Sequence, residues 1–510
     1  MAKFGNFMQR IKAVFLALIF AVIPLQVATA QDVALTSADG TLTVEGRLLS
    51  FDGEYYQIRS SYGDLTLDGS GVSCDGPGCP SLEAYVARAR IAGSAVLGET
   101  LMPVLIEGFA RQEGFDLRRV DQNDRNFTYE LYDRSTDKRL AEFIFDLSDT
   151  PSGFAALQRN DADFALARFA YEGSEFPLPR VLALDAVTFS VAPENPMRAV
   201  PFDALSRLLR GEISNWNELG GPDMPLVSIG GDPDMDSALV LADIFTSQDH
   251  QEGDVQASDQ VLRDNISIGV TRLSDPGTAI ALRLTGACGA DFVPVSLNLK
   301  TRDYPLASPQ FLYQSKQRKP RVVRQFLRYL STDQAARDAD FSGFTSHSLV
   351  EIPIEAQGAR IANAVMQAGD DTSLQDLQEM ILELRNARRL TLTFRFRAGS
   401  TRLDTLSDAD LDVLVHHIEI GRFDGKELIF AGFSDGMGGA VANQRIALRR
   451  ATAIRAAVLE RSDLVKSADV ALTVTGFGEA MPLACDDSEF GREMNRRVEL
   501  WVRDVPVSID

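Results

Sequence analysis

The strongest constraint on the fold is the pattern of residues 390–503, where segments with a period of two alternate with segments of helical period. From Leu390 to Arg397 apolar and polar residues alternate strictly, which indicates a strand with one buried face. Ser407 and Asp410 then form the spacing of a capping box at the start of a helix. Further strands are expected at 427–434, 471–478 and 496–503. The order is βαβαββ and predicts an α/β sandwich.

The second helix of this sandwich carries a charge on the side that should be buried. It is expected to begin near Gly439, and its apolar residues fall in one arc: Ile446, Ala447, Ile454, Ala457 and Val458. Asn443 and Arg450 fall in the same arc. Because an unpaired buried charge is costly, Arg450 needs a partner. Asp435, in the turn before the helix, is the nearest candidate.

Two interpretations of this arrangement stay open on spacing. In the first, which the spacing favours, Asp435 and Arg450 pair with each other and fasten the turn to the helix. In the second, they line a pocket together with Asn443, which lies seven residues before Arg450, about 10 Å along the axis. Such a row suits a zwitterion, whose carboxylate would bind Arg450 and whose ammonium would bind Asp435.

These motifs resemble those of OmpA-like domains, which bind peptidoglycan. Residues 434–438 (SDGMG) match the family's T-D-x-x-G, and residues 495–499 (NRRVE) match its N-R-R-V-E segment. Asn443 and Arg450 fall at the offsets of the family's Asn and Arg. The resemblance implies that Asp435 and Arg450 grip the diaminopimelate of the peptide stem. The family's His and Thr before the Asp are replaced here by Phe433 and Ser434.

The middle of the chain, residues 88–350, alternates expected strands and helices and indicates an α/β architecture. Its segment 211–226 (GEISNWNELGGPDMPL) resembles type 2 periplasmic substrate-binding proteins, in particular the phosphate-transporter group. Segments 90–109, 161–170 and 301–313 resemble further parts of that family. The resemblance implies two lobes that close on a small, phosphate-like oxyanion, held by helix N-termini and hydroxyls. It also implies an ABC permease as a partner.

The candidate anion-binding residues of this region are Ser94, Arg168 and Ser237. The surrounding loops depart from the family pattern, because Ser94 is followed by Ala-Val and Ala167 stands where a Ser often precedes Arg168. The third loop has an Asp directly before Ser237, and an aspartate repels an oxyanion. The alternative is that these residues only cap helices.

The first thirty residues have the features of an export signal. A basic start is followed by the apolar run 13–25, which is too short to span a bilayer, and by Ala28-Thr29-Ala30 as a cleavage site. No later apolar run is long enough to span a membrane. The sequence therefore predicts an exported, periplasmic protein, and the resemblance to OmpA-like domains implies that it associates with the cell wall.

Four cysteines follow the export signal. In an oxidising compartment Cys74 and Cys79 are expected to pair and to close a short Gly-Pro-Gly loop. The spacing leaves the use of Cys288 and Cys485 open. No histidine has zinc-ligand spacing to a cysteine, so no metal site is expected.

The expected organisation is a signal peptide (1–30), a small β-rich module (31–87), the two-lobed binding domain (88–350), a linker and helix (351–389) and the OmpA-like domain (390–510). The formal net charge of −21 disfavours nucleic acid and anionic membranes as partners. No nucleophile elbow, phosphate-binding loop or catalytic triad spacing appears, so neither an enzyme nor a cofactor is expected.

Together these features predict a periplasmic solute-binding protein that is tethered non-covalently to peptidoglycan. The alternative is a structural protein of the envelope whose middle domain no longer binds a solute and instead contacts other proteins. A cell-wall enzyme is the third and least favoured option.

Overall fold

The structure is a computed structural model that describes residues 32–81, 85–229, 241, 264–369, 372–397 and 402–505. The chain divides into two compact units, Met1–Tyr85 and Val86–Asp510. The expected export signal and the loop with Ser237 lie outside the described residues. No helix of the described part has the length and apolar character needed to cross a membrane.

The first unit is an antiparallel sheet of five strands in the order β4-β3-β2-β1-β5. Its strands are β1 (Val33–Ser37), β2 (Thr43–Phe51), β3 (Tyr55–Ser60), β4 (Gly63–Asp68) and β5 (Val72–Asp75). Gly53 turns β2 into β3 with φ +87°, a conformation that favours glycine. Cys74 and Cys79 form a disulfide, as the sequence predicts.

The second unit contains two lobes, which share the long strand β11 (Arg180–Val191). Most of lobe 1 precedes this strand in the sequence. It contains β6 (Ala87–Ser94), β7 (Phe115–Asp121), β8 (Asn126–Asp133), β9 (Arg139–Ser148), β10 (Phe164–Ala167) and β18 (Ala307–Gln314). Its helices are α1 (Met102–Glu113), α2 (Thr150–Gln158), α7 (Arg321–Tyr329) and α8 (Asp333–Phe341). The rings of Phe109 and Phe143 meet Phe326 of α7 at 5.5 and 5.1 Å, which fixes α1 and α7 on the sheet.

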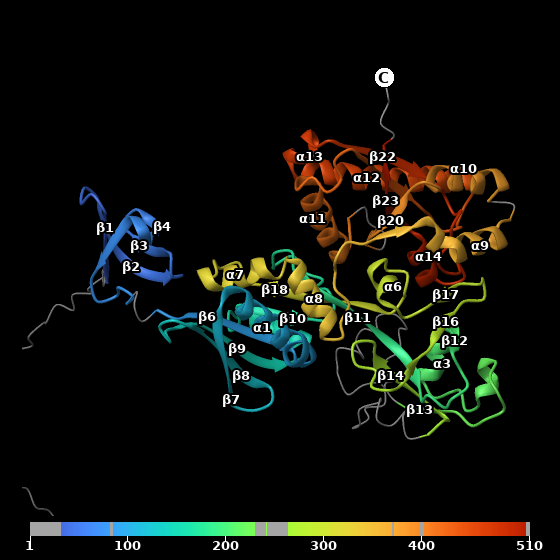
Figure 1. The fold of residues 1–510 in the computed structure, drawn as a ribbon, viewed down its shortest axis with the longest axis horizontal. Coiled ribbons are helices and arrows are strands. Elements are labelled where there is room, and N and C mark those ends of the chain that lie inside the picture. Colours follow the sequence, from blue (N-terminus) through green and yellow to red (C-terminus); the bar gives the residue numbers. More distant parts are fainter. Residues whose placement is uncertain are drawn as a thin grey trace, which may run out of the picture. The chain divides into compact units, whose positions relative to one another are not determined.

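Lobe 2 is built on the second half of β11. The first half of that strand pairs with β18, and the second half pairs with β14 (Ser267–Arg272) and β15 (Ile280–Ala281). The remaining elements of lobe 2 are β12 (Ala199–Pro201), α3 (Leu205–Leu209), β13 (Val227–Ile229), β16 (Arg283–Thr285), β17 (Asp291–Phe292) and α6 (Ser296–Lys300). One strand therefore belongs to both lobes (Figure 1).

The C-terminal domain is a five-stranded sheet in the order β19-β20-β23-β21-β22. Its strands are β19 (Glu351–Pro353), β20 (Arg388–Arg395), β21 (Lys426–Gly432), β22 (Val470–Gly476) and β23 (Arg497–Asp504). Its helices are α9 (Gly358–Gln367), α10 (Leu374–Leu384), α11 (Thr405–Glu419), α12 (Ala440–Arg461), α13 (Asp463–Ser467) and α14 (Glu489–Asn495). The α/β fold class predicted from the sequence is thereby confirmed.

Helices cover both faces of this sheet. Because side chains alternate along a strand, Leu428 and Phe430 of β21 face the core under α11 and α12, whereas Ile429 and Ala431 face the core under α9 and α10. The sequence predicts a linker and a helix in 351–389. The structure has the helix there as α10, with Ser373 as its N-cap, and adds β19 and α9.

Two local predictions in the C-terminal domain are wrong. The predicted polar face of β20 is buried, because its Thr391, Thr393 and Arg395 lie against other parts of the chain. The helix expected to begin at Ser407 begins at Thr405, with Asp404 as its N-cap. The Ser407 hydroxyl instead accepts hydrogen bonds from the backbone of Arg395 and from the guanidinium of Arg302.

Candidate functional site

The loop between β21 and α12 carries the predicted peptidoglycan-binding aspartate. Close packing fixes both ends of this loop. A Cβ atom on Gly432 would lie 2.1 Å from the carbonyl oxygen of Ala447, so only glycine lets α12 approach β21 so closely. Ser434 N donates a hydrogen bond to the Gly478 carbonyl at 2.8 Å. The loop therefore leaves the sheet beside the N-terminus of α12.

Asp435 is paired, but not with Arg450. Its Oδ2 accepts a hydrogen bond from Nη1 of Arg496 at 2.9 Å, and its Oδ1 accepts from Met437 N at 3.3 Å. The interpretation in which Asp435 and Arg450 pair with each other is wrong, because Arg496 at the end of α14 is closer to the carboxylate. The NRRVE segment drew attention to Arg496, but its spacing along the chain did not indicate that Arg496 would pair with Asp435.

Arg450 lies half-buried on α12 with an unsatisfied donor. Its Nη1 atom is buried and has no hydrogen-bond partner among the described residues. Burial lowers the pKa of Arg450, while the charge of Asp435 acts in the opposite direction and that of Arg496 reinforces the lowering. A guanidinium N–H thus remains available next to a carboxylate that can accept further hydrogen bonds.

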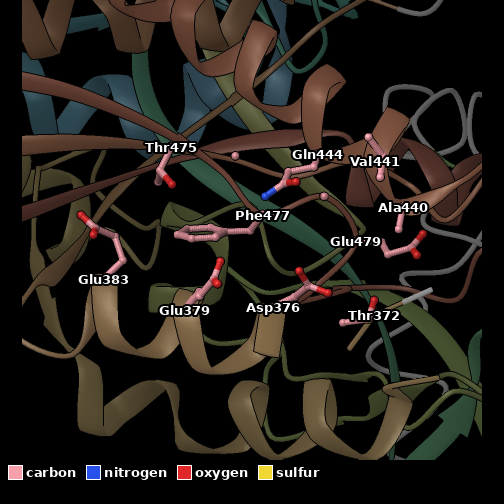
Figure 2. Close-up of a pocket in the computed structure, with 12 residues that line it drawn as sticks. Thr372, Asp376, Glu379, Glu383, Ala440, Val441, Gln444, Thr475, Phe477 and Glu479 are labelled. Carbon is pink, nitrogen blue, oxygen red and sulfur yellow. The ribbon is translucent and has the colours of Figure 1, made fainter. Parts of the chain in front are cut away.

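Asn443 lies on the same helix face and is buried. Its Nδ2 donates to Oε2 of Glu479 at 3.2 Å. Glu479 also lines a neighbouring pocket of about 360 Å³ between α10, the start of α12 and the end of β22. Figure 2 shows the carboxylates of α10 along one side of this pocket and Gln444 and Phe477 along the other. Neither Asp435 nor Arg450 lines it.

Two further residues of the NRRVE segment, Arg497 and Glu499, belong to a buried ion-pair cluster that stabilises the fold. Glu499 is fully buried and forms ion pairs with Arg360, Arg389 and Arg497. Burial by itself would raise the pKa of Glu499, but these three positive charges lower it. Arg497 also lies over the ring of Phe433 at 4.2 Å. This cluster holds β23 against α9 and β20.

In lobe 1, Ser94 and Arg168 leave the sheet at the same end. The strands β6 and β10 are parallel neighbours, with Gly93 opposite Leu166, so Ser94 and Arg168 follow that pair by one and two residues. The helix α2 packs closely beside them, because a Cβ on Gly153 would lie 2.7 Å from the Cα of Gly93. The structure thus brings together two of the three predicted anion-binding residues, and Ser237 lies outside the described part.

Both side chains are sealed from solvent. Ser94 is 0% exposed and Arg168 is 1% exposed. The Ser94 hydroxyl has no hydrogen-bond partner among the described residues. Arg168 N donates to the Thr150 hydroxyl at 3.0 Å, and the Ser308 hydroxyl donates to the Arg168 carbonyl at 2.7 Å.

Thr150 and Ser308 are polar neighbours that the sequence analysis missed. For Thr150 a signal existed, because Asp149-Thr150-Pro151 combines an N-cap residue with a proline in the first turn of α2. For Ser308 no local signal existed, since it reaches Arg168 across 140 residues. In the described part of the chain no three His, Cys, Asp or Glu side chains are grouped so as to hold a metal ion.

Two separate segments of the chain match known protein families. Residues 142–334 match the PBP superfamily domain, and residues 395–496 match the OmpA family. Over 178 residues, or 32% of this chain, the sequence is 22% identical to the phosphate-binding protein PstS of Borreliella burgdorferi. The match spans 64% of the length of that relative.

Two solved structures are similar to different parts of the chain. An ABC-type phosphate transport receptor from Vibrio cholerae is 17% identical with a TM-score of 0.38, and the match covers 51% of this chain and 99% of the receptor. The peptidoglycan-associated lipoprotein from Burkholderia pseudomallei is 21% identical with a TM-score of 0.19, covering 22% of this chain and 89% of the lipoprotein. The family matches thus show that residues 142–334 are similar to the PBP superfamily domain and that residues 395–496 are similar to the OmpA family.

Proposed function

We propose that the protein is a solute-binding protein of the periplasm that is held non-covalently to peptidoglycan by its C-terminal domain. The observation that carries the tether is Arg450, whose half-buried guanidinium keeps an unsatisfied N–H beside Asp435. The ligand is the diaminopimelate-type residue of the peptide stem. Its carboxylate binds Arg450, and its ammonium binds the open side of the Asp435 carboxylate, with Asn443 below them on α12.

The decisive experiment is sedimentation of the purified protein with sacculi. Arg450→Ala and Asp435→Ala should each weaken binding about 10- to 100-fold, because each removes a hydrogen bond between charged groups. Arg461→Ala is the matched control, since Arg461 lies at the far end of α12 and pairs with Asp408 and Asp412. Equal sedimentation of all four proteins would refute the site.

For the middle domain we propose a small, phosphate-like oxyanion as the solute and an ABC permease as the partner. Support comes from the unsatisfied Ser94 hydroxyl and the Arg168 guanidinium, which follow neighbouring parallel strands beside the start of α2. Phosphate or sulfate should raise the melting temperature of the wild type and should raise it less in Ser94→Ala. No catalytic activity is proposed, in keeping with the binding protein among the relatives.

A second candidate function rests on the burial of the same residues. With Ser94 at 0% and Arg168 at 1% exposure, these two residues form no open anion site in the described part of the domain. A middle domain that has lost its solute and serves as a scaffold in the envelope would have this property. The absence of any thermal shift with a panel of oxyanions would favour the scaffold over the receptor.

A further inference from the structure

A second disulfide joins the C-terminal domain to lobe 2. Cys288, in the turn between β16 and β17, is bonded to Cys485, which lies 197 residues further along the chain. The turn fits closely around this bond, because a Cβ on Gly286 would lie 2.9 Å from the sulfur of Cys485. Cys288 N also approaches that sulfur at 3.1 Å.

The segment that carries Cys485 is part of the core of lobe 2. Ala484 and Met494 are buried in the same apolar cluster as the residues of β11, β14 and β16, and Phe490 packs against it. The ring of Phe490 stacks on that of Phe202 with 5.1 Å between the centroids. Segment 483–495, which includes α14, is therefore fixed by lobe 2 as well as by its own domain.

Asp486, next to Cys485, braces the loop that carries Asp435. Its Oδ2 accepts a hydrogen bond from Gly436 N at 2.7 Å, and its Oδ1 accepts from Nδ2 of Asn495 at 2.8 Å. Asn495 in turn accepts hydrogen bonds from the backbone of Leu483 and Ala484. The loop before α12 and the segment around Cys485 are thus cross-linked by side-chain hydrogen bonds.

Arg496 adds a further contact between this segment and the Asp435 loop. It follows Asn495 directly, and its Nη1 holds the Asp435 carboxylate. Two side chains from outside the loop therefore hold Gly436 and Asp435 in place: Asp486 lies within the segment that is fixed by lobe 2, and Arg496 directly follows it.

We propose that Cys288, Cys485 and Asp486 are positioning residues of the peptidoglycan site, so that lobe 2 of the solute-binding domain holds the Asp435 loop in its binding conformation. The inference rests on the proposed function of Asp435 and Arg450. Without the disulfide, segment 483–488 loses its covalent anchor, and the Asp486 carboxylate no longer stays under Gly436. The peptidoglycan site then loses part of its preorganisation, which lowers affinity without removing any ligand-contacting group.

The test compares two pairs of cysteine substitutions in the full-length protein. In Cys288→Ser/Cys485→Ser, we expect sacculus binding to weaken about five- to tenfold and hydrogen exchange at residues 434–438 to become faster. The matched control is Cys74→Ser/Cys79→Ser, which removes the other disulfide in the first unit and should change neither measurement. Wild-type affinity and wild-type exchange in the first pair would overturn the proposal.

A second set of variants keeps the disulfide intact. Asp486→Ala should show the same faster exchange at Gly436 and the same weaker binding. Asp486→Asn should restore part of both, because its amide oxygen can still accept from Gly436 N, although its NH₂ group cannot accept from Nδ2 of Asn495. Equal behaviour of Asp486→Ala and the wild type would refute the positioning role. If the wild type itself does not sediment with sacculi, the proposed function fails, and the hydrogen exchange of the same variants still decides whether lobe 2 orders the loop.

Discussion

The two candidate sites of this protein differ in their access to solvent. In the C-terminal domain the Asp435 side chain is 15% exposed and Arg450 is half-buried, whereas Ser94 and Arg168 of lobe 1 are sealed. Both sites nevertheless form where a strand ends beside the start of a helix. The difference shows that local architecture places the polar groups, while the surrounding parts of the chain decide whether a ligand can reach them. The first candidate site is partly accessible to solvent, whereas Ser94 and Arg168 of the second are buried.

The largest expected effect comes from the buried charges that hold the C-terminal domain together. Glu499→Gln removes the carboxylate shared by Arg360, Arg389 and Arg497 and should lower the free energy of unfolding by about 3–5 kcal/mol. Asp412→Asn is the control, because its ion pair with Arg461 lies at the surface and should contribute less than about 1 kcal/mol. Chemical denaturation measures both. Similar effects of the two variants would mean that the buried cluster stabilises the domain no more than a surface ion pair does.

The same cluster predicts a dependence on pH. Because the folded-state pKa of Glu499 lies below the usual glutamate value of 4.5, its stabilising contribution is complete above that value and is lost as the pH falls toward the folded-state pKa. Wild-type stability should therefore decrease on acidification below about pH 4.5, and part of that decrease should be absent in Glu499→Gln. Melting temperatures between pH 3 and pH 7, about the range in which carboxylates titrate, test this. Parallel curves for the two proteins would contradict it.

Glycine substitutions should separate the two sites. A Cβ on Gly93 would lie 2.3 Å from the Leu166 carbonyl at a φ of +112°, and one on Gly432 would lie 2.1 Å from the Ala447 carbonyl. Each Gly→Ala change should cost about 3 kcal/mol because backbone must move. Gly93→Ala should abolish the response to oxyanions but spare sacculus binding, and Gly432→Ala should do the reverse.

Gly439→Ala is the control for this pair. Nothing lies within 4 Å of a Cβ at Gly439, so the cost should stay near or below about 1 kcal/mol. Loss of both binding activities in either of the first two variants would show that the sites are not independent.

The smallest expected effect concerns two buried hydroxyls, one at each site. The Oγ atoms of Ser94 and Ser434 are buried and have no hydrogen-bond partner among the described residues. Replacing either by alanine removes an unsatisfied polar atom and should stabilise the ligand-free protein by up to about 1 kcal/mol. Thermal unfolding without ligand measures this gain. Destabilisation by Ser434→Ala alone would indicate that the Ser434 hydroxyl makes a stabilising interaction that the Ser94 hydroxyl does not make.

The sequence was most informative where the pattern is local. The strand at β20, the seam of α12 with Asn443 and Arg450 and the Cys74–Cys79 bond all follow from neighbouring residues. The βαβαββ order could be predicted for the same reason, although the helix α14 between the last two strands was missed.

The errors arise where distant segments meet. The polar residues of β20 suggested a solvent-facing side, but Arg389 pairs there with Asp303 of lobe 2 and Thr393 is fully buried. The partner of Asp435 could not be predicted, because Arg496 reaches it over 61 residues. Nor did spacing indicate that Cys288 would pair with Cys485, since that bond depends on how two domains pack.

The shared strand β11 has a consequence for how such a receptor would work on the cell wall. Lobe 2 is joined to the C-terminal domain by a disulfide and by a shared apolar core, so under the proposed tether it would stay fixed relative to the wall. Any motion of lobe 1, which holds Ser94 and Arg168, relative to lobe 2 would then bend the chain where β11 passes from β18 to β14. A receptor attached in this way would keep lobe 2 in the same position relative to the wall with or without a bound solute.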